Sequence, residues 1–306
     1  MSHDRRWWPA VLLTLLMSGL GHVYAGRARL GLLIYLALSA CFTLIAVLGL
    51  FARSWLLLSA GLAVVAVLRV VVIIHAGVSA EGAAKPYKPQ FYNRWWVYVL
   101  LLLVAWFVWP AVVKSLLRHN VVEAFKVPSS SMAPAIQAGD YFFVDKRPAA
   151  RRIPTYNEVI VFQSLSEPGV SVIKRVVGLP GDTLATRDGQ LYRNGRAVKE
   201  AWITPVSPTD TMPLIDESNP RGQAEAVLEH HPTLSRWGPT IVPQGAVYVL
   251  GDNRSYSYDS RYWGPVSLDR ILGRPLWIYF NLARDDLGYR TRWERVGTRP
   301  WVVQPN

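Results

Sequence analysis

The spacing of hydrophobic residues divides the chain into two parts. The first 118 residues contain long uninterrupted apolar runs, whereas residues 119–306 contain short β-branched and aromatic runs separated by glycine and proline. Long apolar runs are typical of membrane helices, and short punctuated runs are typical of strands. The pattern therefore predicts a polytopic membrane anchor over 1–118, followed by a mainly antiparallel β domain over 119–306.

Three of the apolar runs are long enough to cross a bilayer, since about 20 helical residues span about 30 Å of hydrocarbon. They cover residues 30–50, 55–77 and 95–113. The stretch 7–24 is shorter and contains proline and glycine, so it could span the membrane, re-enter it or lie flat on it. It also resembles a secretory signal with cleavage after Ala25, but the spans that follow at once favour an uncleaved anchor of three or four spans.

Charges in the loops predict the orientation of the anchor. The connection 78–94 holds three basic residues, whereas the connection between the first two long spans holds only Arg53. Because cytoplasmic loops are enriched in lysine and arginine, 78–94 is expected inside and the C-terminal domain outside. The N-terminus is also outside if 7–24 spans, and inside if it does not; the second arrangement fits the charge rule better. Arg69 lies within the second span, where a charge is costly unless it faces a partner or snorkels to the interface.

Composition narrows the classes of function. The chain has 306 residues, 51% of them hydrophobic, and a formal charge of +12. Of its first 118 residues, 11 are basic and 2 are acidic, so the excess charge lies beside the apolar runs, as in membrane proteins. No basic, aromatic-interleaved motif predicts nucleic-acid binding. The single cysteine, Cys41, excludes an intrachain disulfide and a thiolate cluster, and neither a metal nor a cofactor is predicted.

The C-terminal part contains six runs that read as strands. A two-residue Asn194-Gly195 turn predicts a hairpin within one of them. Residues 199–244 are polar and rich in proline, and we interpret them as an inserted loop or subdomain. The predicted strands cover residues 141–144, 158–162, 170–177, 190–198, 246–250 and 272–280.

Three short segments contain the candidate chemistry: 127–134 (VPSSSMAP), 172–182 (VIKRVVGLPGD) and 251–264 (GDNRSYSYDSRYWG). Each segment alone has an ordinary explanation, because serines between prolines usually form a turn and a strand lysine usually extends to the sheet edge. Alternation along the second segment predicts that one of Lys174 and Arg175 faces inward and the other outward.

Taken together and in this order, the three segments resemble the type I signal peptidase (leader peptidase) family over about residues 121–282. The resemblance implies a Ser/Lys dyad, with Ser131 as nucleophile, Lys174 as general base and an acyl-enzyme intermediate. It also implies an oxyanion hole formed by the Ser129 hydroxyl and the Ser131 backbone N–H. This chain departs from the family where Asn157-Glu158 replaces the usual Gly-Asp, a position expected to be structural.

The same resemblance implies supporting roles for four other residues: Ser257 orients the lysine, Asp259 and Arg261 form an ion pair near the site, and Met132 helps to bury the amine. Burial matters because an ordinary lysine has a pKa of about 10.4 and is charged at neutral pH, whereas a buried one loses its proton more easily. A histidine triad is the commoner alternative. The six histidines disfavour it, since they lie in the membrane half, at His119, and in the adjacent pair His230-His231, which also lacks further metal ligands nearby in the sequence.

The function implied is a membrane-bound serine endopeptidase that removes signal peptides from exported preproteins. The expected location is the bacterial cytoplasmic (inner) membrane, with the catalytic domain on the periplasmic side. Expected partners are the signal sequences and the lipid bilayer, and the secretion translocon is a further candidate. Two alternatives stay open: a specialised maturation peptidase with one dedicated substrate, and a non-catalytic membrane scaffold, which the intact serine and lysine set disfavours.

Overall fold

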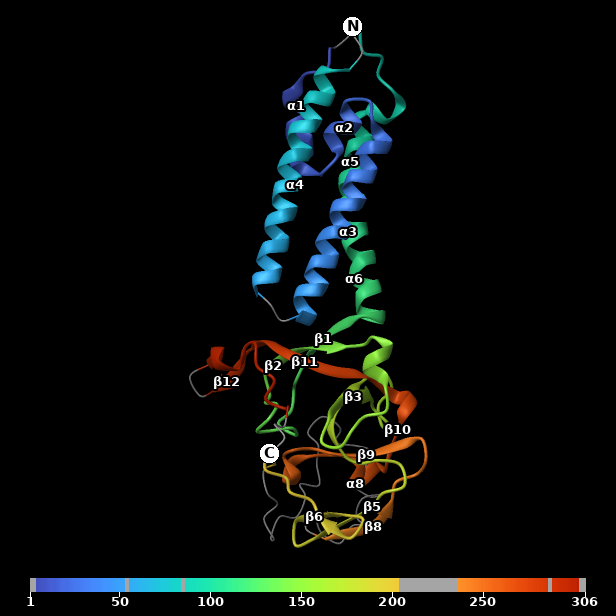
Figure 1. The fold of residues 1–306 in the computed structure, drawn as a ribbon, viewed down its shortest axis with the longest axis vertical. Helices are drawn as coiled ribbons and strands as arrows, with labels where there is room; N and C mark the ends of the chain where they lie inside the picture. Colours follow the sequence, from blue (N-terminus) through green and yellow to red (C-terminus); the bar gives the residue numbers. More distant parts are fainter. Residues whose placement is uncertain (1–3, 53–54, 84–85, 204–235, 286–287, 303–306) are drawn as a thin grey trace. The chain divides into compact units, whose positions relative to one another are not determined.

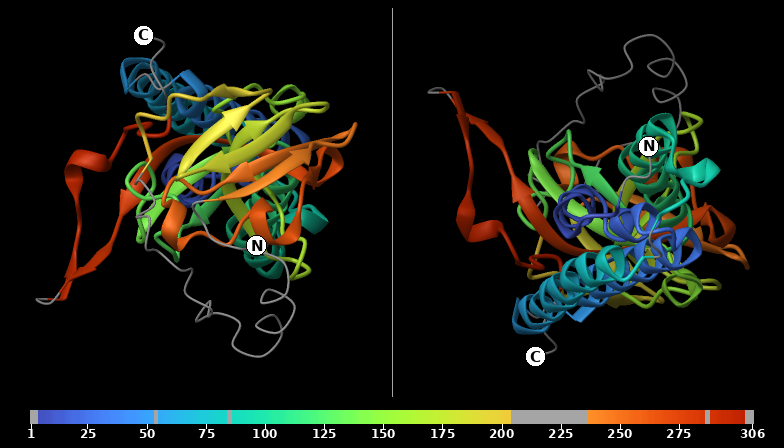
Figure 2. Two further views of the ribbon diagram at one scale, coloured as in Figure 1. Left: turned by 90° about the horizontal axis from the view of Figure 1, so that it is seen from below. Right: turned by 90° about the horizontal axis from the view of Figure 1, so that it is seen from above.

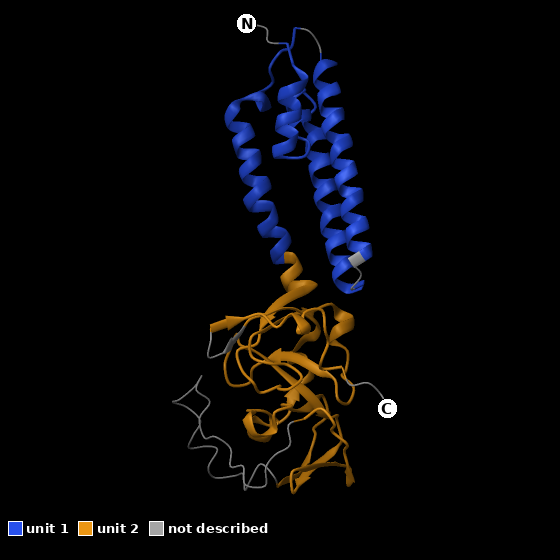
Figure 3. Cartoon of the chain, turned by 90° about the vertical axis from the view of Figure 1, so that its left-hand side faces the viewer, with its two compact units in different colours: residues 1–115 blue, residues 116–306 orange. Residues whose placement is uncertain are grey.

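The computed structural model describes residues 4–52, 55–83, 86–203, 236–285 and 288–302 (Figure 1). The chain forms two compact units, residues 1–115 and 116–306 (Figure 3). The first unit is helical and the second is built mainly from strands. This confirms the predicted fold class, a set of apolar helices followed by a mainly antiparallel β domain.

Three long apolar helices are found among the described residues. They are α3 (Ala28–Ala52), α4 (Trp55–Glu81) and a continuous helix made of α5 (Trp95–Leu103), the π-helical turn η2 (Val104–Val108) and α6 (Trp109–Asn120). Each is long and apolar enough to cross a membrane, with a mean hydropathy of 2.3 to 2.7. The helices extend beyond the predicted runs, because helical hydrogen bonding continues past the apolar stretches.

The ambiguous stretch 7–24 forms two short helices rather than one. Helix α1 (Trp7–Leu16) is followed by a break and then by α2 (Leu20–Tyr24). Ten helical residues rise only about 15 Å, which is half the thickness of the hydrocarbon. Gly19 has a φ of +93° and lies at the break, where a Cβ would be 2.0 Å from the Gly31 carbonyl oxygen, so only glycine fits there.

Side chains from the long helices donate hydrogen bonds to the carbonyl groups at the end of α1. Arg69 of α4 donates to the Leu15 carbonyl at 2.9 Å, and Trp106 donates to the Leu16 carbonyl at 3.2 Å. A helix end leaves such carbonyls without backbone partners, and a cation is favourable beside them. Arg69 thus has the polar partner that its place inside a span requires.

The beginning of α1 and the end of α2 meet the same loop. The Arg5 guanidinium lies 4.1 Å from the ring centroids of both Tyr24 and Tyr87. Asn93, just before α5, donates to the Val23 carbonyl at 2.9 Å. The residues before α1, the end of α2 and the loop before α5 therefore lie together.

In the second unit, all strand pairs are antiparallel among the residues that the structure describes. One sheet has the order β1-β2-β11-β3-β4-β9-β10, and a second has β7-β6-β5-β8. Strands β12 and β13 pair with each other in the red arm that projects from the rest of this unit in Figure 2. The strands are β1 (Val122–Lys126), β2 (Asp140–Asp145), β3 (Val159–Gln163), β4 (Ser171–Gly178), β5 (Thr183–Arg187), β6 (Gln190–Arg193), β7 (Arg196–Ala197), β8 (Trp237–Ile241), β9 (Ala246–Leu250), β10 (Val266–Ser267), β11 (Ile271–Asn281), β12 (Ala283–Asp285) and β13 (Gly288–Arg290).

The six predicted runs all contain strands, and the predicted hairpin joins β6 to β7. Asn194 and Gly195 have φ of +53° and +79° there, as a type I′ turn requires. The region interpreted as an insertion, 199–244, falls mostly on 204–235, outside the described residues. Its last part is a strand, since β8 pairs with β5.

A hydrophobic cluster lies under the turn that precedes β2. Met132 and Ile136 are fully buried there, with Phe142 of β2 and Trp301 near the C-terminus packed against them. A second cluster, which includes Ile160 and Val176, fills the space on the other side of the β3, β4 and β9 segment. Strand β4 is therefore covered on both faces.

Candidate active site

Ser131 and Lys174 come together although 43 residues separate them in the sequence. The Lys174 amine lies 2.7 Å from the Ser131 hydroxyl oxygen. Lys174 is in the middle of β4, opposite Ile160 of β3, and only 4% of it is exposed. A serine hydroxyl and a lysine amine at this distance can exchange a proton directly.

The segment that carries Ser131 is fixed from both ends. At the base of the loop between β1 and β2, the Val127 N–H donates to the Asp140 carbonyl and the Gly139 N–H donates to the Val127 carbonyl, both at 2.9 Å. The Met132 side chain inserts fully into the core, so the preceding residue, Ser131, is held at the edge of the cluster. Ser129 is exposed, and its hydroxyl lies 3.3 Å from the Ser131 hydroxyl.

The segment 251–264 holds the other side of the serine loop. The Asn253 N–H donates to the Ser131 carbonyl at 3.1 Å, and its side-chain amide donates to the Ser130 carbonyl at 3.3 Å. Gly251 permits this approach, because a Cβ there would lie 2.2 Å from the Ser257 hydroxyl and 2.5 Å from the Ser131 carbonyl oxygen. No role was predicted for Gly251 or Asn253. Their place in the third motif, beside the candidate residues, was the available indication.

Ser257 is buried and tied to a buried ion pair. Its hydroxyl donates to the Asp259 carboxylate at 2.6 Å, and the same carboxylate oxygen accepts the Gly251 N–H at 2.9 Å. Arg261 closes the arrangement with two bonds to Asp259, at 2.8 and 2.9 Å. Burial alone would raise the pKa of Asp259, but the Arg261 guanidinium and these hydrogen bonds outweigh it and hold the pKa below its ordinary value.

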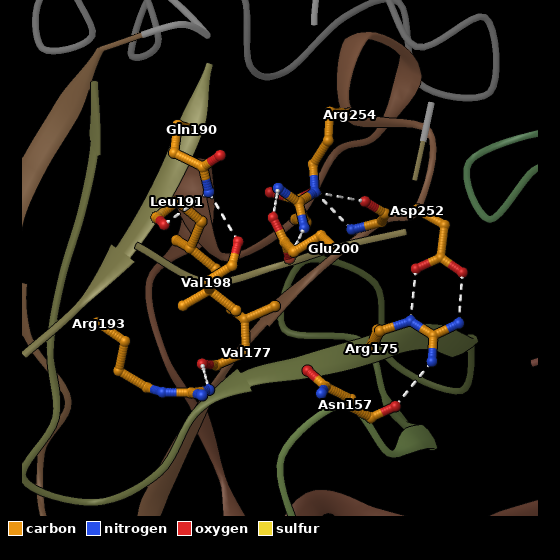
Figure 4. A network of polar contacts seen from close by, with 12 residues as sticks. Asn157, Arg175, Val177, Gln190, Leu191, Arg193, Val198, Glu200, Asp252 and Arg254 are labelled. Carbon is orange, nitrogen blue, oxygen red and sulfur yellow. Dashed lines mark hydrogen bonds and ion pairs between the residues drawn. The ribbon is translucent and has the colours of Figure 1, made fainter. Parts of the chain in front are cut away.

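The prediction that one of Lys174 and Arg175 faces outward is wrong, because both side chains are buried. The alternation itself holds, but both faces of β4 are covered, so neither residue reaches solvent. The Arg175 guanidinium makes two bonds to Asp252, at 2.7 and 2.6 Å, and one to the Asn157 carbonyl at 2.7 Å (Figure 4). It also donates to the Trp301 carbonyl at 3.0 Å and lies 5.3 Å from the ring centroid of Trp202.

Asn157-Glu158, the departure from the usual Gly-Asp, has a physical explanation. Asn157 has a φ of +66°, a conformation that glycine adopts freely and that asparagine tolerates better than most residues. Glu158 supplies the acidic side chain and accepts hydrogen bonds from Arg274 at 2.5 Å and Arg152 at 2.9 Å. Asn157 thus tolerates the positive φ of this turn, and Glu158 supplies a carboxylate that binds two arginines.

A further buried ion pair joins the third motif to Glu200. Arg254 binds Glu200 through two nitrogens, one of them at 2.9 Å, and both side chains are almost completely buried (Figure 4). Arg254 also donates to the Gly251 carbonyl at 3.1 Å. Together with the Arg175 and Arg261 pairs, it makes the segment 251–261 a rigid support for the serine loop.

The chain is similar in sequence to known signal peptidases. Residues 95–280 match the family described as signal peptidase, peptidase S26. The signal peptidase I of Pseudomonas aeruginosa is 33% identical over 208 residues, covering 59% of this chain and 72% of that protein. The signal peptidase I of Bacillus caldolyticus is 34% identical over 55% of this chain and 85% of its own length. A solved signal peptidase I from Enterococcus faecalis is 32% identical, covering 40% of this chain and 95% of that one, with a TM-score of 0.27.

Apolar helices followed by this β domain, together with these relatives, define a membrane serine endopeptidase. More closely, the chain belongs to the signal peptidase family, peptidase S26. The family match begins at Trp95, the first residue of α5. Helices α1 to α4 therefore lie outside the part of the chain that matches the family.

Proposed function

We propose that this protein removes signal peptides from exported preproteins, with Ser131 as nucleophile and Lys174 as general base. The observation that carries the proposal is the distance of 2.7 Å between the lysine amine and the serine hydroxyl. Burial of Lys174 supports it further, because an apolar site disfavours the ammonium form and leaves a neutral amine able to accept a proton.

In the proposed reaction, the amine of Lys174 takes the hydroxyl proton as the Ser131 oxygen bonds to the scissile carbonyl carbon. The tetrahedral intermediate collapses when the C–N bond breaks, and Lys174 returns the proton to the leaving amine. Lys174 then takes a proton from water, which attacks the acyl-enzyme, and Ser131 regains its proton as the carboxylic acid leaves. The Ser129 hydroxyl and the Ser131 N–H stabilise the oxyanion, and a single donor of this kind is typically worth about 3 kcal/mol.

The remaining candidate residues have positioning roles in this proposal. Ser257 orients the Lys174 amine, and Asp259 fixes Ser257 through the bond of 2.6 Å. Arg261 keeps Asp259 ionised and in place. Met132 supplies apolar surroundings for the amine and anchors the serine loop. No step in the reaction calls for a metal or a cofactor.

We further propose that the protein lies in a bacterial cytoplasmic membrane, with three spans and the catalytic domain on the outer side. In this topology α1 and α2 re-enter the membrane from the cytoplasmic side. The short length of α1 supports this, as does the capping of its end by Arg69, the fifteenth residue of the 27-residue helix α4. The basic residues at 5, 6, 27, 29, 85, 88 and 94 would then all be cytoplasmic.

Cleavage of a reporter preprotein by the detergent-solubilised protein tests the dyad. Ser131→Ala and Lys174→Ala should each reduce kcat/KM at least about a thousandfold, as removal of a nucleophile or its base does in other serine peptidases. Lys174→Arg should fail equally, because a guanidinium is not deprotonated in proteins. Ser166→Ala and Lys199→Arg, at exposed positions, are matched controls that should retain full activity. Full activity of Ser131→Ala or Lys174→Ala would refute the mechanism.

The breadth of substrates distinguishes the general peptidase from a specialised one. A panel of preproteins with small residues at the first and third positions before the scissile bond should all be cleaved. Cleavage of only one member would favour a dedicated maturation peptidase. The bilayer and the secretion translocon are proposed partners, since the signal sequence is itself held in the membrane when it is cleaved and a shared membrane raises its effective concentration.

A further inference from the structure

The C-terminal tail of the chain returns to the two segments that carry the candidate dyad. The tail is paired with β11, because the Gly297 N–H donates to the Ile278 carbonyl at 2.7 Å and the Ile278 N–H donates to the Thr298 carbonyl at 3.1 Å. Arg295 adds a bond of 2.9 Å to the buried Asp140 carboxylate. The tail is therefore part of the folded second unit up to the residues around Trp301.

The indole of Trp301 lies behind the serine loop. Only 5% of Trp301 is exposed, and its side chain belongs to the hydrophobic cluster that contains Met132 and Ile136. Its ring centroid is 6.0 Å from that of Phe142. Met132 directly follows Ser131, so the indole helps to fill the cluster in which the serine segment is anchored.

The backbone of Trp301 lies behind the lysine strand. Its carbonyl accepts a hydrogen bond of 3.0 Å from the buried guanidinium of Arg175, the residue next to Lys174. The other Arg175 bonds run to Asp252 and to the Asn157 carbonyl. A buried guanidinium needs such partners, because a buried donor without a hydrogen bond is costly.

We propose that Trp301 is a positioning residue for the Ser131–Lys174 dyad. Its side chain packs in the same hydrophobic cluster as Met132, the residue after Ser131. Its carbonyl accepts a hydrogen bond from Arg175, the residue after Lys174. The inference rests on the proposed function, because it assigns a role within that reaction. A displacement of about 1 Å between reacting groups can lower a rate about a hundredfold, so a residue that packs in the cluster behind one member and binds the neighbour of the other is able to control turnover.

Five full-length or shortened proteins test the proposal in detergent, with the wild type beside them. The substitutions are Trp301→Ala, Trp301→Phe and Val302→Ala, and the shortened chains end after Pro300 or after Val302. Val302 is 56% exposed and is the matched neighbour. For each protein, kcat and KM on the reporter preprotein are measured well below its own melting temperature, with the folded fraction determined by near-UV circular dichroism.

We expect Trp301→Ala and the chain ending at Pro300 to lose at least tenfold in kcat per folded molecule, with KM within twofold of wild type. Trp301→Phe should recover most of the rate, because it restores apolar volume beside Phe142 and retains the carbonyl. Val302→Ala and the chain ending at Val302 should behave as wild type. A Trp301→Leu variant replaces Trp301→Ala if the latter does not fold, with the same loss of kcat expected in smaller measure.

An unchanged kcat in folded Trp301→Ala or Trp301→Leu, accompanied only by a lower melting temperature, would overturn the proposal and leave a purely structural role. A raised KM with an unchanged kcat would also overturn it, because the residue would then act on substrate binding. Failure of the proposed function has a different signature. In that case the wild type would not cleave the reporter, or Ser131→Ala would cleave it as fast as the wild type does.

Discussion

Buried charged side chains are concentrated around the candidate dyad. Arg175, Arg254 and Arg261 are each at most 5% exposed, and each binds a buried carboxylate. Removing two charges from water is expensive, so such pairs add little net stability, but removing one partner leaves an uncompensated charge and is strongly destabilising. These residues therefore fix geometry more than they increase the free energy of unfolding.

Replacement of Asp259 tests this view at a single residue. Asp259→Asn should destabilise the protein by about 3 kcal/mol or more, because the buried Arg261 loses its carboxylate and Ser257 loses its anchor. The measurement is thermal unfolding of the detergent-solubilised protein. Asp188→Asn is the control: Asp188 pairs with Arg236 at 3.2 Å, but both side chains are largely exposed, so the change should stay within about 1 kcal/mol. Equal effects of the two substitutions would contradict the argument.

The lowered pKa of Asp259 gives this pair a defined pH dependence. A carboxyl whose pKa is lower in the folded state stabilises fully above its unfolded pKa, about 3.9, and loses that contribution as the pH falls further. The melting temperatures of wild type and Asp259→Asn should therefore differ by a constant amount from pH 7 to about pH 5. Below about pH 4 the difference should narrow, and a difference that stayed constant down to pH 3 would count against the ionised pair.

At the residue scale, residues within recognisable motifs could be predicted from the sequence, whereas the residues that support them could not. Ser131 and Lys174 were identified by the joint resemblance of three motifs to the signal peptidase family, whereas each motif alone favoured a turn or a lysine at the sheet edge. Arg175 was placed by strand alternation alone, which cannot tell that both faces of β4 are covered. The contact of Arg175 with the Trp301 carbonyl spans 126 residues and involves a backbone atom, so no side-chain pattern records it.

At the scale of elements, strands with strong apolar or β-branched patterns were predictable and the others were not. Strand β9 is a continuous apolar run, and β4 and β11 contain apolar runs interrupted by Lys174-Arg175 and by Arg274-Pro275. Strand β1 (Val122–Lys126) includes Glu123 and Lys126 and lies at the sheet edge, where polar residues are tolerated. Strand β8 (Trp237–Ile241) contains Pro239 and sits at an edge as well, so composition alone indicated a loop.

The two glycines that flank β9 make a matched pair for testing how that element supports the site. Gly251→Ala should lower kcat at least tenfold, because its Cβ would meet both the Ser257 hydroxyl and the Ser131 carbonyl oxygen within 2.5 Å. Gly245→Ala meets nothing within 4 Å but has a φ of +77°, so it should reduce the melting temperature and leave kcat unchanged. The assay is reporter cleavage per folded molecule. A normal kcat in Gly251→Ala would show that the close approach is not required.

At the scale of the whole molecule, the family match and the helical unit do not coincide. The match begins with the last long helix and continues to residue 280 in β11, whereas α1 to α4 precede it. The long helices were predictable because their apolar runs exceed the thickness of a bilayer. The division of 7–24 into two helices was left open, since it depends on Arg69 and Trp106, which lie 54 and 90 residues from the carbonyls that they cap.

The proposed three-span topology can be tested by labelling single cysteines in intact cells. In a Cys41→Ser background, Arg6→Cys, Lys88→Cys and Lys199→Cys are introduced at exposed positions. A membrane-impermeant maleimide should label Lys199→Cys at once, but Arg6→Cys and Lys88→Cys only after the membrane is permeabilised, because α1 and α2 return to the cytoplasmic side. Labelling of Arg6→Cys in intact cells, with Lys88→Cys still protected, would mean that 7–24 crosses the membrane. Protection of Lys199→Cys would place the β domain inside, away from exported substrates, and would contradict both the topology and the proposed function.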